Sequence, residues 1–473
     1  MMKTVCIMGG GLGGLMTGAL LAQEGYRVTV LEKNGIIGGG LQSFCRGGYL
    51  FDTGMHIFGG MGADGQLRRI CRHLGIEERV EVEPCHVALL NADTGERITH
   101  TTDCHSPLID LLRGIAAQEP VYALRPTPDD FTPPDITLTA KQLIDETDDQ
   151  PELKAAMASL ALFYGGRDDS PALLHALISC AHIDGTYTFK VGSLGFAKLL
   201  AGIIEEAGGE VHCGEAVTSI ETSGREVSAV RTATAVYTAD HYVNDMPVAR
   251  LLELTPADAF APAFRCRIGS APYSMSAMTL FIGLKPRSLR YSSEACLALR
   301  DGIDPWHMDD CTEELWPNAL FAIASEDAEN TGFANTITAV CPMKYDYVQR
   351  WENSITGHRP DEYYRWKERM VQQALAMTET IYPQLKEAIA FVDAGTPLTI
   401  RDYYGTPRGA MYGLHRSSIN PMQSSLSTRT RLGNLYLTGQ DVNFHGLLGT
   451  SLTAILTAEA IVGRNVIMNK LIC

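Results

Sequence analysis

The first residues of this chain that could do chemistry are a glycine-rich run and an acid that follows it. Gly9–Gly14 matches the pattern G-x-G-x-x-G, and Glu32 lies eighteen residues after Gly14. In such a turn the glycines bend the chain, let the backbone approach a pyrophosphate and let helix and strand pack closely. The helix N-terminus favours phosphate, and the acid accepts hydrogen bonds from ribose hydroxyls. The spacing predicts a dinucleotide held by Gly9, Gly11, Leu12, Gly13, Gly14 and Glu32.

These residues need a βαβ unit to position them. Residues 3–8 have the pattern of a buried strand, 15–24 of a helix and 27–32 of a second buried strand. A second match, Gly60–Gly65, lacks a suitable strand before it and an acid after a following strand. We interpret it as a structural turn in which Asp64 caps a helix from Gln66. One fingerprint therefore predicts one dinucleotide cofactor.

Other elements follow from periodicity and turn residues. The segment 86–100 predicts a hairpin that turns at Asp93-Thr94-Gly95. Residues 106–182 have helical patterns, interrupted by a proline-rich loop. Further elements are strands at 47–52, 274–284, 319–341 and several between 209 and 245, and helices at 66–74, 193–207, 363–377 and 448–462.

Composition excludes several functional classes. The chain has 473 residues, 45% hydrophobic and 20% charged, with a formal net charge of −16. An acidic surface disfavours nucleic acid as a partner. Twelve cysteines without a CxxC pair predict no metal site and a reducing, cytoplasmic location. The apolar runs are shorter than the ~20 residues of a membrane-spanning helix, so we expect no transmembrane segment.

Three stretches resemble the flavoprotein superfamily of phytoene desaturases, carotenoid isomerases and retinol saturases. They are VCIMGGGLGGLMTGALLAQEGYRVTVLEKNGIIGGGLQSF, YLFDTGMHIFGG and NLYLTGQDVNFHGLLGTSLTAILTAEAIVG. The segment 185–220 is similar to the middle of these proteins. The resemblance implies FAD, with Asp441 on the ribityl chain and a helix N-terminus at the N1–O2 edge of the flavin. It further implies cofactor contacts at Lys33, Gly39, Gly40, Leu41, His56, Val217, Gly439, Gly446, Leu447 and Leu448.

One position departs from the desaturase pattern. Desaturases and amine oxidases commonly have arginine after the paired glycines, whereas this chain has Gly40. Retinol saturase-like members resemble it in having a small residue there, and YLTGQD and the segment 407–413 also look most like theirs. The resemblance implies an FAD-dependent oxidoreductase that saturates, desaturates or isomerises carbon–carbon double bonds of an apolar, polyene-like substrate. Drift at position 40 is the other explanation of the departure.

The resemblance also implies the fold. It predicts an α/β protein with a Rossmann-type FAD-binding domain at residues 1–100, 185–265 and 425–473. An interleaved α+β substrate domain, a mixed sheet with helices, would occupy 101–184 and 266–424. The partners expected are an apolar small molecule and a separate electron donor, and the protein could touch a membrane peripherally.

No catalytic set stands out. His56, Tyr412 and His445 fall in segments that should approach the flavin, and each is either a proton donor or a polar wall residue, of which the second is the more common role. A flavin amine oxidase is one alternative, kept open by Tyr403, Tyr404 and Tyr412 as a potential aromatic pair. A lipid-binding protein like the Rab GDP-dissociation inhibitors is another, against which Glu32 and Asp441 argue.

Overall fold

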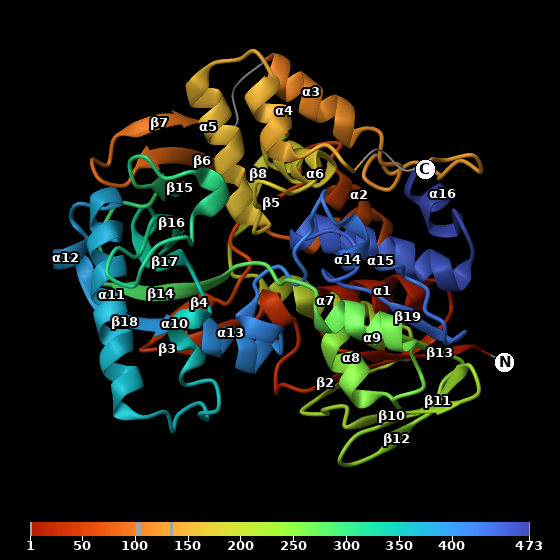
Figure 1. Ribbon diagram of the computed structural model, residues 1–473. Coiled ribbons are helices and arrows are strands. Elements are labelled where there is room, and N and C mark those ends of the chain that lie inside the picture. Colours follow the sequence, from red (N-terminus) through yellow and green to blue (C-terminus); the bar gives the residue numbers. More distant parts are fainter. Residues whose placement is uncertain (1, 101–105, 133–135, 473) are drawn as a thin grey trace.

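The computed structural model describes residues 2–100, 106–132 and 136–472 (Figure 1). The predicted βαβ unit is confirmed as β1 (Thr4–Met8), α1 (Leu12–Gln23) and β2 (Arg27–Glu32), with β1 and β2 parallel. Helix α1 begins three residues earlier than expected, at Leu12, so Gly13 and Gly14 lie in its first turn. A Cβ on Gly14 would overlap the carbonyl oxygen of Gly9, which explains the glycine.

The first sheet is entirely parallel, in the order β19-β13-β1-β2-β9. Its other strands are β9 (Glu210–Cys213), β13 (His241–Asn244) and β19 (Leu435–Leu437). Val5 and Ile7 of β1 face one core and Cys6 and Met8 face another. The first core holds α1, α7 (Leu194–Glu206) and α15 (Gly446–Val462). The second holds β10 (Ser219–Ser223), β11 (Glu226–Arg231), β12 (Val236–Tyr237), α8 (Val248–Leu254) and α9 (Pro262–Gly269).

The second sheet is larger and mixed, in the order β18-β14-β17-β16-β15-β6-β8-β5, and β7 pairs with β6. Only β15 and β6 are parallel among these described pairs. The strands are β5 (Phe58–Gly59), β6 (Val82–Asn91), β7 (Arg97–His100), β8 (Thr186–Phe189), β14 (Ser276–Leu284), β15 (Glu294–Leu299), β16 (Ala319–Glu326), β17 (Ala334–Met343) and β18 (Ile389–Gly395). The hairpin predicted at residues 93–95 is confirmed as β6–β7. The single stretch 319–341 is instead two antiparallel strands.

Helices cover both faces of the larger sheet (Figure 1). Helix α11 (Asp361–Ile381) packs on one face through Trp366 and Met370. On the other face lie α3 (Pro107–Ala116), α4 (Ala140–Glu146), α5 (Pro151–Ser159), the 3-10 turn η3 (Leu160–Phe163) and α6 (Ala172–Ile183). The parallel sheet with its helices and the mixed sheet together confirm the predicted α/β fold.

The remaining elements are short connections. They are η1 (Gly39–Leu41), β3 (Ser43–Arg46), β4 (Tyr49–Asp52), α2 (Gln66–His73), η2 (Glu77–Arg79), η4 (Pro305–His307), α10 (Asp346–Gln349), α12 (Leu385–Ala388), α13 (Pro397–Tyr404), η5 (Pro407–Gly409), α14 (Pro421–Ser424) and α16 (Val466–Ile472). The cap expected from Asp64 is wrong: the N-cap of α2 is Gly65, and no side chain caps this helix. Strands β5, β6 and β8 join the mixed sheet, and the division of the chain into two domains stays a prediction.

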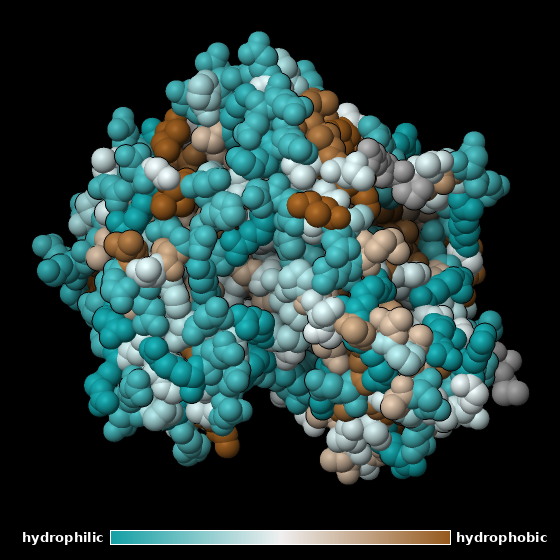
Figure 2. Space-filling view, in the orientation of Figure 1, coloured by the Kyte–Doolittle hydropathy of each residue, from teal (hydrophilic) through white to brown (hydrophobic). Residues whose placement is uncertain are grey.

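The face of the protein in Figure 2 is mostly hydrophilic, as expected for a chain with a formal net charge of −16. It carries small separate groups of hydrophobic residues. Across the described part of the chain, every helix is too short or too polar to span a bilayer.

The glycine turn at the start of α1 supports a stability prediction. Gly14→Ala should lower the free energy of unfolding by more than ~2 kcal/mol, because the new Cβ has no space beside the carbonyl of Gly9. Gly202→Ala in α7 is the matched control: its Cβ would meet nothing within 4 Å, and we expect a gain of about 0.5–1 kcal/mol. Urea unfolding of the three proteins measures both changes. Equal stability of Gly14→Ala and the parent would contradict the packing argument.

Candidate cofactor and substrate site

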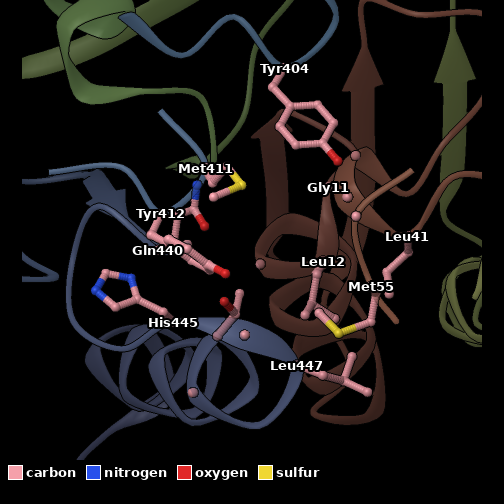
Figure 3. Close-up of a pocket in the computed structure, with 18 of the residues that line it drawn as sticks. Gly11, Leu12, Leu41, Met55, Tyr404, Met411, Tyr412, Gln440, His445 and Leu447 are labelled. Atoms are coloured by element: carbon pink, nitrogen blue, oxygen red, sulfur yellow. The ribbon is translucent and has the colours of Figure 1, made fainter. Parts of the chain in front are cut away.

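A large cavity, of about 480 Å³, lies where four parallel strands end (Figure 3). The residues that follow β1, β2, β13 and β19 all line it. In open α/β sheets, ligands bind at the carboxyl ends of the strands. Of the residues predicted to contact the cofactor, all except Gly14 line this cavity. The cavity therefore gathers residues from both ends of the chain.

Three glycine segments form its floor. The Gly38 N–H donates to the carbonyl of Gly10 at 2.7 Å, so the paired glycines pack against the first turn. A Cβ on Gly39 would come 3.2 Å from Cα of Gly11, and a Cβ on Gly13 would come 2.8 Å from Cα of Gly439. Bare backbone at these places leaves the N-terminus of α1 accessible from the cavity. The cradle fits a diphosphate, which is held by backbone N–H groups rather than by side chains.

Glu32 and Lys33 lie at the end of β2. The Glu32 carboxylate is 5% exposed and accepts the N–H groups of Gly10 at 2.9 Å and Asn34 at 2.7 Å. It thereby ties the glycine turn to the end of β2, and its predicted contact with ribose stays a prediction. The ammonium of Lys33 donates to the carbonyl of Asp402 at 3.0 Å, and burial lowers the pKa of Lys33. Val217, predicted near the adenine, lines the same cavity.

Tyr404 lies beside the small residue at position 40. Figure 3 shows its ring at the top of the cavity with the hydroxyl directed toward Gly11. That hydroxyl lies 3.5 Å from the place of a Cβ on Gly40 and 2.5 Å from that of a Cβ on Gly54. A long side chain at position 40 would therefore meet Tyr404. Burial raises the pKa of Tyr404, so it is a neutral phenol.

Asp441 is engaged with the backbone of two other segments. Its carboxylate is 7% exposed and accepts the N–H of Val248, at the start of α8, at 3.0 Å and the N–H of Leu414 at 3.3 Å. Burial raises the pKa of Asp441, although Arg416 and these N–H groups oppose the shift. Asp441 thus joins α8 and the segment around Leu414 to the end of β19. The predicted contact with the ribityl chain stays a prediction.

The three candidate proton donors all line the cavity. Tyr412 and His445 lie edge to face, with ring centroids 6.1 Å apart. Burial lowers the pKa of His445 to about 3, lowers that of His56 and raises that of Tyr412, so all three are neutral near pH 7. Nε2 of His56 and Nδ1 of His445 are buried without a hydrogen-bond partner in the described part of the chain. Their role as proton donors or as polar wall residues stays a prediction.

A second wall of the cavity comes largely from the segments 152–166 and 170–183, whose apolar faces suit either core packing or, by the family resemblance, a tunnel for an apolar substrate. We call it the apolar arm; it comes from α6, η3, the mixed sheet and a neighbouring loop. It consists of Tyr122, Leu162, Phe163, Leu174, Leu177, Ile178, Ala181, His182, Thr279, Phe321 and Val340. Phe163 packs edge-on against Phe321, with centroids 5.7 Å apart, and tilted against His182 at 4.8 Å. Burial lowers the pKa of His182 to about 4, so the apolar arm carries no charge near pH 7.

Asp245 also lines the cavity, directly after β13, and the sequence analysis missed it. The signal was present: an acid at the carboxyl end of a parallel strand. It could be used only once β13 was known to lie beside β1, and strands of the segment 209–245 form two different sheets. Arg250 and Gln440 were missed for the same reason. Figure 3 shows Met411, Tyr412, Gln440 and His445 across the cavity from Gly11, Leu12, Leu41 and Met55.

The chain is similar to known proteins both in sequence and in fold. A family model described as flavin containing amine oxidoreductase matches residues 12–462. All-trans-retinol 13,14-reductase of Danio rerio is 26% identical over 522 residues, which cover 97% of this chain and 86% of that protein. The 4,4'-diaponeurosporene oxygenase of Staphylococcus aureus is 23% identical, covering 94% of each chain. The solved CLA-producing fatty acid isomerase from P. acnes has a TM-score of 0.64 and 15% identity, covering 97% of this chain and 98% of its own. That likeness shows the fold alone.

The contacts of Asp441 generate a prediction. Asp441→Ala should lower the free energy of unfolding by about 2–4 kcal/mol, because two N–H groups lose their acceptor, and weaken FAD affinity by about one to two decades. Asp441→Asn keeps an acceptor oxygen and should lose about half as much stability. Denaturant unfolding and flavin titration measure the two effects, with the exposed Asp258→Ala as control. Unchanged FAD affinity in Asp441→Ala would remove Asp441 from the cofactor site.

Proposed function

The chain belongs to the family of flavin-containing amine oxidoreductases, and on that premise we propose that this FAD-dependent oxidoreductase acts on carbon–carbon double bonds of an apolar polyene. The reaction is saturation, desaturation or isomerisation. The observation that carries the substrate class is the uncharged apolar arm beside the glycine cradle. The FAD supplies the redox chemistry, and the protein binds, orients and shields the substrate.

We propose that the cavity residues with bare backbone hold the cofactor. Gly9, Gly11 and Gly13 would receive the diphosphate, with Glu32 and Val217 at the adenosine end. The N-terminus of α15, at Gly446, would lie against the isoalloxazine, where its partial positive charge stabilises an anion. The bare backbone of the glycine floor at the start of α1 supports this assignment. Further contacts would come from Leu12, Lys33, Gly39, Gly40, Leu41, His56, Gly439, Asp441, Leu447 and Leu448.

The relatives support a polyene. The names of two of them specify all-trans-retinol and diaponeurosporene, which are long conjugated molecules. Burial of such a molecule is driven by its apolar surface, at about 25 cal/mol per Å². The apolar arm offers leucines, isoleucine and two phenylalanines for that contact. A neutral Tyr412 or His445 would hold a proton near the reacting carbon atoms.

An amine oxidase is the competing function within the family. Tyr403, Tyr404 and Tyr412 all line the cavity, as an aromatic pair would require. A protonated amine, however, needs an anionic partner when it is buried. Among the described residues of the apolar arm there is no aspartate or glutamate. A lipid-binding protein without flavin is disfavoured by membership of a flavin family.

Absorption spectroscopy tests the proposed function and its direction. The holoenzyme, reduced anaerobically with dithionite, is mixed with all-trans-retinol and with a longer hydrocarbon polyene. Saturation shortens the conjugated system and shifts its absorption to shorter wavelength, whereas isomerisation keeps the number of double bonds. Desaturation requires oxidised flavin and shifts absorption to longer wavelength. Unchanged polyene spectra together with hydrogen peroxide release from an amine would establish the amine oxidase instead.

Because the apolar arm carries no charge, we expect it to bind uncharged ligands in preference to charged ones. A polyene alcohol should bind at least about ten-fold more tightly than the carboxylic acid of the same chain, because a buried carboxylate would find no cation there. The methyl ester of that acid is the matched control and should recover the lost affinity. Quenching of protein fluorescence measures all three. Equal binding of acid and ester would show that the head group stays outside the apolar arm.

A further prediction concerns the electron donor. The turn at Gly60–Gly65 follows β5, which pairs antiparallel with β8 and belongs to the mixed sheet. It therefore lacks the parallel βαβ setting of a nicotinamide site. We expect NADPH or NADH to reduce the flavin slowly and a separate reductase or dithionite to reduce it fully. Stopped-flow mixing without oxygen measures this, and saturable bleaching at about 1 s⁻¹ or faster would contradict it.

We propose a cytoplasmic location with peripheral membrane contact. The ten described cysteines are all free thiols, as in a reducing compartment. Exposed Ile419 follows Ser418, whose hydroxyl donates to the carbonyl of the exposed Leu138, and Met422 is exposed as well. An apolar substrate would reach such a surface from a lipid phase. Co-sedimentation with neutral phosphatidylcholine vesicles tests this contact.

A further inference from the structure

Asp245 occupies the N-terminus of helix α1. Its carboxylate lies against the backbone of Gly11 and Gly14, whose N–H groups favour its ionised form. An added Cβ would come 2.7 Å from Oδ2 at Gly11 and 2.5 Å from Oδ1 at Gly439, and a Cβ on Gly13 would overlap Oδ1. The carboxylate therefore lies among glycines of the same cradle that suits a diphosphate. A helix N-terminus attracts one anion as well as another, so the carboxylate and the diphosphate require the same place.

The groups around Asp245 do not compensate its charge. Glu32, at the end of β2, and Asp441, after β19, both disfavour the ionised form. Lys33 and Arg250 line the same cavity, but Lys33 donates to the carbonyl of Asp402 and Arg250 to Glu253 at 2.8 Å. Arg416 is next to Asp441. The glycine turn between β1 and α1 contributes N–H groups and no charged side chain. Burial, first, and the two acids raise the pKa of Asp245 to about 7.

A diphosphate in the cradle adds two negative charges beside Asp245. At a few ångströms, away from bulk water, such a repulsion strongly opposes binding of the diphosphate unless one charge is removed. A protonated carboxyl removes the charge, releases the N–H groups and has an O–H that can donate to a phosphate oxygen. We propose that Asp245 competes with the diphosphate of FAD for the N-terminus of α1, and that FAD binds together with one proton taken from solvent onto this carboxyl.

The proton uptake makes the affinity for FAD fall as the pH rises. Below about pH 7, Asp245 is already protonated in the free protein and the affinity for FAD does not change with this group. Above pH 7 each binding event takes up a proton, so the dissociation constant rises about ten-fold per pH unit. The effect ends where the carboxyl ionises in the presence of FAD. This inference concerns the cofactor and is independent of the substrate.

Dilution of the holoenzyme, with released FAD followed by its fluorescence, measures the dissociation constant between pH 6.5 and pH 8.5. We expect about a twenty-fold increase for the parent protein over this range. Asp245→Asn removes the charge at nearly constant shape, so its dissociation constant should stay within about two-fold across the range and be lower than the parent value at pH 8.5. Asp240→Asn is the matched control. Asp240 flanks the other end of β13 and accepts the N–H of Thr4 outside the cavity, and its variant should follow the parent.

A second measurement counts the proton directly. Calorimetric titration of FAD into the deflavinated parent at pH 8, in two buffers with different ionisation enthalpies, should show uptake of about one proton, and Asp245→Asn should show none. No proton uptake by the parent would overturn the proposal even if the variant failed to fold. Weaker FAD binding by Asp245→Asn at pH 8.5 would also overturn it, because Asp245 would then be a ligand of the cofactor rather than its competitor.

Discussion

The close approach of three glycine segments is the constraint on which the rest of this structure depends. Gly38 donates to Gly10, and Gly13 would collide with Gly439 if it carried a Cβ. The second contact joins residues more than 400 positions apart, and α15 lies beside α1 in the same core. These contacts require the parallel sheet, because only neighbouring parallel strands deliver all these turns to one edge. Bare backbone at that edge lets an anion approach the N–H groups at the start of α1.

The two ends of the cavity differ in charge. The end near the glycines is rich in carboxylates: the buried Glu32 and Asp441, which accept backbone N–H groups, and the partly buried Asp245, which lies against the glycines. These acids organise the turns that surround them. The apolar arm has only neutral polar groups, because burial lowers the pKa of His182 to about 4. One cavity thus combines a place suited to a charged group with a place suited to an uncharged apolar molecule, and α6 with the mixed sheet lines the second of them.

Several polar residues serve the fold at the same place where they are proposed to serve the cofactor. Asp441 holds the start of α8 and the segment at Leu414. Tyr404 fills the space above Gly40 and Gly54, which an arginine at position 40 would need. The position that departs from the desaturase pattern therefore lies against a residue of α13. Such shared contacts mean that a substitution at the site changes stability and binding together.

The sequence by itself determined the local features of this protein. The βαβ unit, the turn at residues 93–95, the glycine fingerprint and most helices follow from short-range patterns, because periodicity and turn chemistry act over a few residues. Family resemblance supplied the distant glycines and Asp441. Only the tertiary structure decided that 319–341 is a hairpin, that Gly65 rather than Asp64 caps α2, and that Asp245 and the apolar arm share one cavity. These depend on strand order and on long-range packing, and no pattern in one segment records which other segment will lie beside it.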